Sequence, residues 1–291
     1  MTSQSLGLLY DPVPSAATIA LRSAFAAVFY SVLHIVAKTI AAQSIHPKIW
    51  NAFSNRDKSI LAEKVCSTVN SLFIGGAGLY FVLVSDAFAN ADLFATYPPE
   101  LDWVFPQLVG YTIYDTATMY LQGDWPMAMW IHHYMTLYAT FGMPIYRRLA
   151  VLVVYFFITE LTASIQNVIW FHQNVDPSAL LSPETEAVEL LKLKAKRSRT
   201  YAQLLFVRVC GFLFFRTWVV PYLLYLIPVL SGGWIPFVQT LRNEPLGLSI
   251  PAVLMFSMFG YINADWTIMA VRAWQRKTRG TAKDAKDAKE Q

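Results

Sequence analysis

The sequence is poor in charged residues and has very little cysteine. Charged residues make up 14% of the 291 residues and hydrophobic residues 55%, whereas soluble proteins carry about 25% charged residues. The two cysteines, Cys66 and Cys210, both lie in apolar segments, so the sequence predicts neither a disulfide framework nor a zinc site. A chain this apolar would expose large hydrophobic patches to water, whereas a lipid bilayer solvates them. The sequence therefore predicts an integral membrane protein.

Basic residues are missing from the start of the chain. No basic residue precedes Arg22, and no short apolar run ends there in a cleavage-like site. A cleavable signal peptide has both features, so we expect the first membrane helix to direct membrane insertion. The net charge is only +4, and the basic residues lie between apolar segments and at the C-terminus. This distribution argues against nucleic-acid binding and is typical of membrane topology.

Seven segments are long and apolar enough to be predicted as membrane spans. A spanning helix needs about 20 mostly apolar residues. The predicted spans are residues 16–42, 65–85, 103–121, 126–146, 149–171, 203–229 and 248–271. The third and fourth are the most polar, and the sixth contains Pro221 and Pro228, at which we expect a kink or a break. The predicted fold class is an all-α, polytopic membrane helical bundle.

The connections between these segments differ in charge. Lys and Arg are frequent in 43–64, 172–202 and 272–291, whereas 1–15 and 86–102 contain none. Seven spans place the three basic segments on one side of the membrane. The positive-inside rule then predicts that this side, with the C-terminus, is cytosolic. The basic residues at 147–148 and at 242 are exceptions, because they fall on the other side.

The chain divides into three predicted parts. Residues 1–59 form an N-terminal segment with the first span, and residues 60–275 form a membrane domain of six helices. Residues 276–291 are low in apolar residues and are predicted to be a disordered cytosolic tail. Within the long connection, residues 184–199 carry acidic residues first and basic residues last. This order favours a solvated helix, whose bases would also attract anionic headgroups.

Polar and ionisable residues interrupt five of the predicted spans. Such groups are costly in a bilayer core unless they are paired or hydrated, so each marks a candidate functional site. The candidates are Asp115, His132, His133, Glu160, Asn167, Arg208, Arg216, Asn263 and Trp266. In the predicted topology most of them fall in the cytosolic half of the membrane. The sequence therefore predicts one polar chamber inside the bundle that opens towards the cytosol.

Several of these residues also have a structural interpretation. Arg208 with Asp265, or Arg216 with Glu160, would form ion pairs that hold helices together. For the two asparagines, the structural alternative is a hydrogen bond between helices.

The adjacent His132 and His133 are harder to explain by packing. Neighbouring residues on a helix point about 100° apart, so the two rings cannot both pack against the same neighbouring surface. Imidazole acts as base, acid or nucleophile near neutral pH. The sequence contains no HxxxH or HxxE spacing around the pair, so no metal site is predicted.

The order of these motifs resembles that of the TLC domain family. The matching residues are Tyr114–Asp115, the His132–His133 pair in HHYMT, the glutamate of TELTASIQN, the arginine of FLFFRTW and the asparagine and tryptophan of YINADW. The family includes ceramide synthases, the translocon-associated TRAM proteins, the neuronal ceroid lipofuscinosis cargo receptor and several small TLC-domain proteins. In its length and its seven predicted spans, this chain most resembles the small TLC-domain proteins. The resemblance covers residues 60–275 and implies a helical bundle of the endoplasmic reticulum with a lipid cavity lined by the His pair.

This sequence keeps part of the ceramide synthase pattern. In those enzymes an HHxxT motif opens a signature with two later aspartates, and its histidines transfer the acyl group. The motif is present at residues 132–136, but Glu160 stands at or beside the first aspartate position. The second position falls among Ala163 and Ser164. The soluble homeobox-like domain of many ceramide synthases is absent from the sequence.

Two hypotheses of function follow. The first is a membrane acyltransferase that uses acyl-CoA as co-substrate and a lipid amine or hydroxyl as acceptor, with no bound cofactor. His132 or His133 would be the base or the acyl carrier, Asp115 would orient it, and Arg208 would neutralise an anionic leaving group. The predicted substrate-binding residues are Glu160, Asn167, Arg208, Arg216, Asn263 and Trp266. The second hypothesis is a non-catalytic protein that binds or senses membrane lipids and regulates membrane composition or trafficking.

A transporter is a third, weaker hypothesis. The sequence has no detectable inverted repeat, which many transporters have. Gly75, Gly76 and Gly78 lie together in the second predicted span and would allow a close helix contact.

Overall fold

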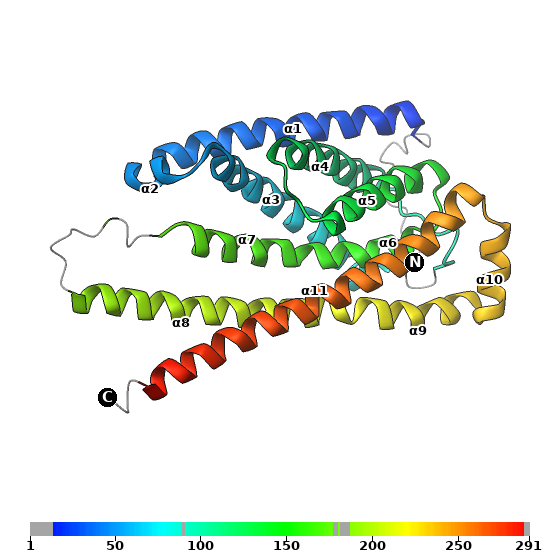
Figure 1. The fold of residues 1–291 in the computed structure, drawn as a ribbon. Helices are drawn as coiled ribbons and strands as arrows, with labels where there is room; N and C mark the ends of the chain where they lie inside the picture. The colour runs from blue at the N-terminus through cyan, green and yellow to red at the C-terminus, as the bar shows by residue number, and fades with distance from the viewer. Residues whose placement is uncertain (1–13, 89–90, 177–179, 181–186, 288–291) are drawn as a thin grey trace, which may run out of the picture.

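The computed structural model describes residues 14–88, 91–176, 180 and 187–287. The chain starts with α1 (Ala16–Ser44), α2 (Pro47–Ala52), α3 (Asn55–Leu83) and η1 (Asp86–Phe88). The helices α4 (Leu101–Gln122) and α5 (Met127–Tyr146) follow, and then a continuous rod of α6 (Ala150–Phe157), η2 (Ile158–Glu160) and α7 (Leu161–Asn174). A second rod consists of α8 (Ala187–Phe212), the π turn η4 (Leu213–Thr217) and α9 (Val219–Ser231). The short α10 (Trp234–Asn243) leads into α11 (Leu246–Asp287), and no strand occurs among these residues (Figure 1).

The helices pack as a bundle with two distinct ends (Figure 1). We call the end where α7 finishes, α8 begins and α11 finishes the tail end. The head end is the opposite one, where α1, α4 and α11 begin and α5 finishes (Figure 1). The short α6 lies at the centre of the packing, since all eight of its residues are buried. This central position explains why its sequence, AVLVVYFF, is apolar on every face.

Five helical segments of the described chain are long and apolar enough to cross a membrane. They are Ala16–Ser44, Asn55–Leu83, Ala150–Asn174, Val188–Ser231 and Leu246–Gly280. These segments confirm the multi-pass helical bundle and coincide with five of the predicted spans. The third and fourth predicted spans are also helices, α4 and α5, but they are more polar, so the total of seven stays a prediction. The burial of α4 on several faces explains its polarity, because buried positions need not be lipid-soluble.

The outer face of α1 has the composition of a lipid contact. Between Ala20 and Ile40, the exposed side chains of this helix are hydrophobic apart from Ser31 and Thr39. Both hydroxyls are satisfied within the helix, since Ser31 donates to the carbonyl of Ala27 and Thr39 donates to a carbonyl one turn back. A helix with such a face is stable in hydrocarbon, where backbone and side-chain polar groups must find partners inside the protein.

The sixth predicted span differs from the expectation in two ways. Its interruption is the π turn at Leu213–Thr217, not a break at the prolines. Pro221 lies in the first turn of α9, where no backbone N–H is needed, and the helix continues past Pro228 to Ser231. The helix predicted at 184–199 is not a separate loop helix, because α8 runs unbroken from Ala187 into the span; residues 184–186 lie outside the described residues.

The last helix is longer than the seventh predicted span. α11 continues to Asp287, whereas the sequence predicts a disordered tail from residue 276. The added segment is rich in alanine and lysine, which are strong helix formers. The apolar part of α11 therefore provides a nucleus from which the helix extends.

Two of the three clustered glycines of α3 allow close helix packing. A Cβ atom at Gly78 would lie 2.9 Å from the backbone nitrogen of Ile158, and one at Gly75 would lie against Leu161. Gly76 has no atom within 4 Å of its Cβ position. The close contact predicted for this cluster thus involves Gly75 and Gly78, and it joins α3 to the rod of α6, η2 and α7.

A close glycine contact with backbone atoms joins α1 and α4, and its loss should destabilise the bundle. A Cβ atom at Gly110 would lie 2.7 Å from the backbone nitrogen of Ala27 and against the carbonyl oxygen of Ser23. Because backbone atoms cannot rotate aside, Gly110→Ala forces the helices apart, and we expect a loss of about 2 kcal/mol. Unfolding in detergent measures this loss. Gly76→Ala is the matched control, and equal stability of the two variants would contradict the close contact.

Candidate functional site

A cavity of about 830 Å³ lies among α3, α4, α5, α7, α8 and α11. We call it the polar chamber. Its lining contains all the site residues that the sequence predicts except Asn263, namely Asp115, His132, His133, Glu160, Asn167, Arg208, Arg216 and Trp266. The chamber extends towards the tail end of the bundle, since Trp125, Gln173 and Arg276 also line it. The structure thus brings together polar residues that are far apart in the sequence.

The turn between α4 and α5 sets the depth of Asp115 and His133 in the bundle. Gly123 and Asp124 both have positive φ angles, 66° and 53°, and glycine adopts such a conformation readily. The turn reverses the chain, so α4 and α5 run antiparallel side by side. Asp115 lies about two turns before it and His133 about two turns after it. The two side chains therefore meet at one depth in the bundle.

His133 and Asp115 form a buried contact. The exposed fraction is 5% for His133 and 6% for Asp115, and His133 Nε2 lies 3.3 Å from Asp115 Oδ2. The hydroxyl of Tyr111, one turn earlier on α4, donates to the same carboxylate oxygen at 3.3 Å. Because a carboxylate accepts, we assign the hydrogen of the imidazole to Nε2 of His133, which leaves Nδ1 with a lone pair.

His132 has different surroundings. Its ring lies at a right angle to that of His133, with 5.4 Å between centroids. On the α11 side it packs against Phe259 at 5.1 Å and Trp266 at 5.8 Å. The two histidines thus differ in kind, because His133 contacts a carboxylate and His132 contacts aromatic rings.

Arg216 occupies the π turn of the sixth helical segment and joins three elements. Its Nε donates to Thr162 Oγ1 at 2.5 Å, and its Nη1 donates to Asn263 Oδ1 at 2.9 Å. Its guanidinium carbon lies 4.9 Å from the ring centre of Trp266. Within the described residues it makes no ion pair with Glu160, the pairing that the sequence suggested, although both line the chamber. Its main contacts hold α7 and α11 in place.

Arg208 and the two asparagines also differ in their roles. Arg208 Nη1 donates to Gln166 Oε1 at 3.3 Å, so the suggested partner Asp265, which is exposed, is replaced by a neutral amide. Asn167 donates to the Lys64 carbonyl at 3.1 Å and ties α7 to α3. Asn263 accepts from Arg216 outside the chamber lining.

A comparison with known families assigns the chain. The family model of the TLC domain matches residues 61–272. This chain belongs to the TLC domain family. The match contains all the predicted site residues and falls inside the predicted membrane domain of residues 60–275. No curated protein matches the sequence. With its apolar helices, this TLC-domain protein is a multi-pass membrane protein of a lipid-related family.

Several buried polar atoms of residues that line the polar chamber have no hydrogen-bond partner within the described part of the chain. They are Trp125 Nε1, His132 Nδ1, His133 Nδ1 and Arg208 Nε. Buried polar atoms are paired in the great majority of cases. These atoms include both donors and acceptors, so the residues that line the chamber have hydrogen-bonding capacity that the described structure does not use.

The sequence interpretation missed an acid–base pair on α3. Glu63 is 4% exposed, and its Oε2 lies 2.8 Å from Nζ of Lys64. Both residues line the polar chamber. The sequence placed them in a connection because the second span was predicted to start at residue 65. The sequence SNRD forms a capping box of Ser54 with Asp57 that starts α3 at Asn55, and this signal would have placed both residues on a helix.

Proposed function

We propose that this TLC-domain protein transfers a fatty acyl group from acyl-CoA to a lipid amine or hydroxyl in the polar chamber. The observation that carries the proposal is the buried contact between His133 Nε2 and Asp115 Oδ2, 3.3 Å apart. Nδ1 of His133 has no partner among the described residues, and the residue lines the cavity. An oriented imidazole with a free lone pair is suited to be a general base.

The chemistry of such a step can be written with these groups. The hydroxyl or amine of the acceptor gives its proton to His133 Nδ1, and its oxygen or nitrogen bonds to the thioester carbonyl carbon. The carbon–sulfur bond then breaks, and the proton passes from His133 to the thiolate of coenzyme A. Asp115 stabilises the imidazolium that exists between the two transfers. The products are the acylated lipid and free coenzyme A.

We place the protein in the membrane of the endoplasmic reticulum, with the tail end of the bundle facing the cytosol. The chamber extends to this end, where acyl-CoA would have access, and the positively charged Arg208 in its lining is suited to bind an anionic group of acyl-CoA. At the head end, Arg147 pairs with Asp102 and Arg148 pairs with Glu244, so both of these bases have a counterion on the side where the positive-inside rule does not predict them. Hydrogen bonding to Glu244 also raises the pKa of the Arg148 guanidinium.

A second candidate function is lipid binding without catalysis. One observation favours it. Near the position of the second aspartate of the ceramide synthase signature, Ala163 lines the chamber and the hydroxyl of Ser164 donates to the carbonyl of Leu161 at 2.6 Å. The chamber therefore has no carboxylate at either residue, which favours the binding of a lipid over its conversion.

One assay separates the two candidates. The purified full chain in lipid nanodiscs is incubated with acyl-CoA and a panel of lipid amines and alcohols, and the release of coenzyme A and the acylated product are measured. We expect a product that disappears in the variant with both His132→Ala and His133→Ala. Binding of lipid without turnover by the wild-type protein would contradict the acyltransferase and support the second candidate.

A further inference from the structure

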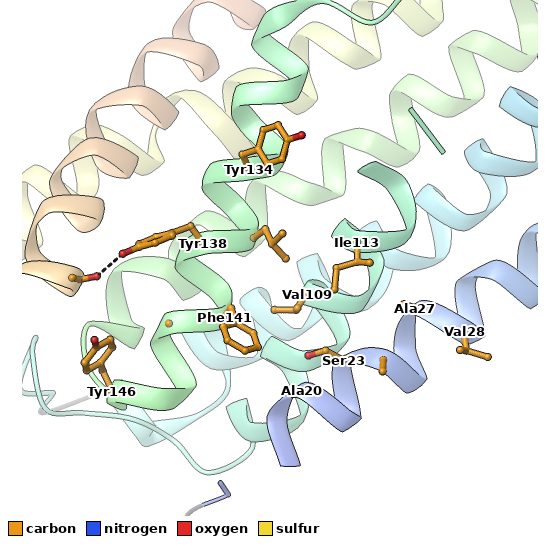
Figure 2. Close-up of a pocket in the computed structure, with 14 residues that line it drawn as sticks. Ala20, Ser23, Ala27, Val28, Val109, Ile113, Tyr134, Tyr138, Phe141 and Tyr146 are labelled. Atoms are coloured by element: carbon orange, nitrogen blue, oxygen red, sulfur yellow. Dashed lines mark hydrogen bonds between the residues drawn. The ribbon is translucent and has the colours of Figure 1, made fainter. Parts of the chain in front are cut away.

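A second cavity, of about 970 Å³, lies between α1, α4 and α5 (Figure 2). We call it the lateral groove. Side chains of α1, α4, α5 and Gly247 at the start of α11 line it. Its volume is in the range of ligand sites, which is about 300–1,000 Å³. α5 separates the groove from the polar chamber, since Tyr134 and Tyr138 line the groove whereas His132 and His133 line the chamber.

The walls of the groove are apolar and differ in shape. The α1 wall consists of small side chains, Ala20, Ser23, Ala24 and Ala27, with Val28 at its end. The α5 wall facing it is largely aromatic, with Tyr134, Tyr138, Phe141 and Tyr146 (Figure 2). Val109 and Ile113 of α4 lie between the walls (Figure 2). None of the lining residues is charged, so the groove suits a hydrocarbon chain.

The groove opens towards the lipid side of the bundle. Leu21 and Phe25, which flank its small wall on α1, are 58% and 68% exposed. On the opposite wall Tyr134 is 57% and Tyr138 is 54% exposed. The hydroxyl of Tyr138 donates to the carbonyl of Gly247 at 3.1 Å (Figure 2). A molecule in the groove is therefore in contact with the bilayer along its length.

Two arginines flank the head end of the groove. Arg22 precedes Ser23 of the small wall, and Arg147 follows Tyr146 of the aromatic wall. Both meet at Asp102 in the first turn of α4: Arg22 Nη1 donates to its carbonyl at 3.0 Å, and Arg147 Nη1 donates to its carboxylate at 3.0 Å.

Both guanidinium groups retain donors for a further partner. A guanidinium has five N–H donors, and in the described structure Arg22 and Arg147 hydrogen-bond through Nη1 alone. Arg148 is different, because Nε and Nη2 donate to the two carboxylate oxygens of Glu244. Arg22 also stacks on Trp103 at 3.8 Å. Tryptophan is typical of the membrane–water interface, which is the depth of lipid phosphates.

We propose that the lateral groove binds one glycerophospholipid of the head-end leaflet. An acyl chain lies between the small wall of α1 and the aromatic wall of α5, and the phosphate accepts hydrogen bonds from Arg22 and Arg147. Arginine binds phosphate through parallel N–H donors. A sterol fits an apolar groove as well, but its single hydroxyl makes little use of two guanidinium groups. This site is separate from the proposed acyl transfer and does not depend on it.

Photo-cross-linking of the full chain in nanodiscs tests the groove. The probe is a phosphatidylglycerol with a diazirine in its acyl chain, and the labelled peptides are identified by mass spectrometry. We expect labels on residues 20–28 and 134–142. Gly142→Leu should abolish them, because Gly142 lines the groove and a Cβ there meets no atom within 4 Å. Gly76→Leu on α3, which is equally open, is the matched control and should keep them.

Two further probes test the phosphate contact. A diacylglycerol with the same diazirine chain should label the groove more weakly than phosphatidylglycerol. The variant with Arg22→Gln and Arg147→Gln should remove this difference, whereas Arg22→Lys with Arg147→Lys should retain part of it. Equal labelling by both probes in the wild-type protein would overturn the phosphate site. Labelling by a photoactivatable sterol in place of phosphatidylglycerol, or labels unchanged in Gly142→Leu, would overturn the phospholipid groove.

Discussion

Replacing His133 by asparagine is expected to lower the rate of acyl transfer by about 10²–10⁴-fold, the usual contribution of a general base. Asparagine keeps a polar side chain at this position but has no lone pair that can take and return a proton at neutral pH. The same change at His132 should cost far less, because that ring packs against Phe259 and Trp266 and has no carboxylate partner in the described residues. The kcat and KM values of both variants measure the difference.

The comparison of the two histidines also separates chemistry from folding. Both variants should elute as the same species as the wild type and bind acyl-CoA with similar affinity. KM measures this affinity when the chemical step is slow. A larger loss of kcat in His132→Asn than in His133→Asn would contradict the assignment of His133 as the base. Equal losses, with weaker acyl-CoA binding in both variants, would instead indicate that the pair shapes the chamber.

The positions of the membrane helices follow directly from the sequence. A spanning helix must satisfy its backbone internally and present apolar side chains to lipid, so long apolar runs identify it with little need for tertiary information. α1 and α6 are clear cases, one with a lipid-facing side and the other buried on every face. Helix ends are harder, because solvated extensions such as the first turns of α8 carry no apolar signal.

The gathering of polar residues in one chamber was also predictable, for the same physical reason. Groups such as Asp115 and His133 cannot face lipid, so they point inwards and meet at similar depth. Their pairing was not predictable. The sequence suggested a pair of Arg216 with Glu160, yet Arg216 bonds to Thr162 and Asn263. A π turn adds a residue to one helical turn, and no spacing rule for a regular helix anticipates the rotation it causes.

The depth of a residue in the membrane is also predicted wrongly where a helix begins before its apolar segment. The sequence predicts Glu63 and Lys64 in a loop, whereas the structure buries Glu63 in the wall of the polar chamber. The lateral groove was missed for a different reason. Its lining of alanine, valine and tyrosine looks like any lipid-facing helix surface, and only the packing of α1 beside α4 and α5 turns these surfaces into a cavity.

Replacing Asp115 by asparagine is expected to reduce kcat by about 10²–10⁴-fold while leaving KM nearly unchanged. The carboxylate oxygen Oδ2 lies 3.3 Å from His133 Nε2 and accepts a hydrogen bond from the hydroxyl of Tyr111. An amide in its place can turn its NH₂ group towards His133 Nε2, which then becomes the acceptor. The hydrogen of the imidazole moves to Nδ1, and the lone pair needed for proton abstraction is lost. The side-chain volume stays the same, so the chamber should keep its shape.

Tyr111→Phe is the matched control for this change. It removes the hydrogen bond from the Tyr111 hydroxyl to Asp115 but leaves the carboxylate and the His133 tautomer in place. A hydrogen bond to a carboxylate is worth about 1.5–3 kcal/mol. Because this one is present before the reaction as well as in the transition state, its loss predicts a decrease in kcat below about tenfold. The tautomer itself can be read by ¹⁵N NMR of labelled histidine, which distinguishes protonated Nδ1 from protonated Nε2. An Asp115→Asn protein that keeps hydrogen on Nε2 and full activity would show that the carboxylate is not what orients the base. The fold would then retain a buried polar chamber whose chemistry rests on other residues.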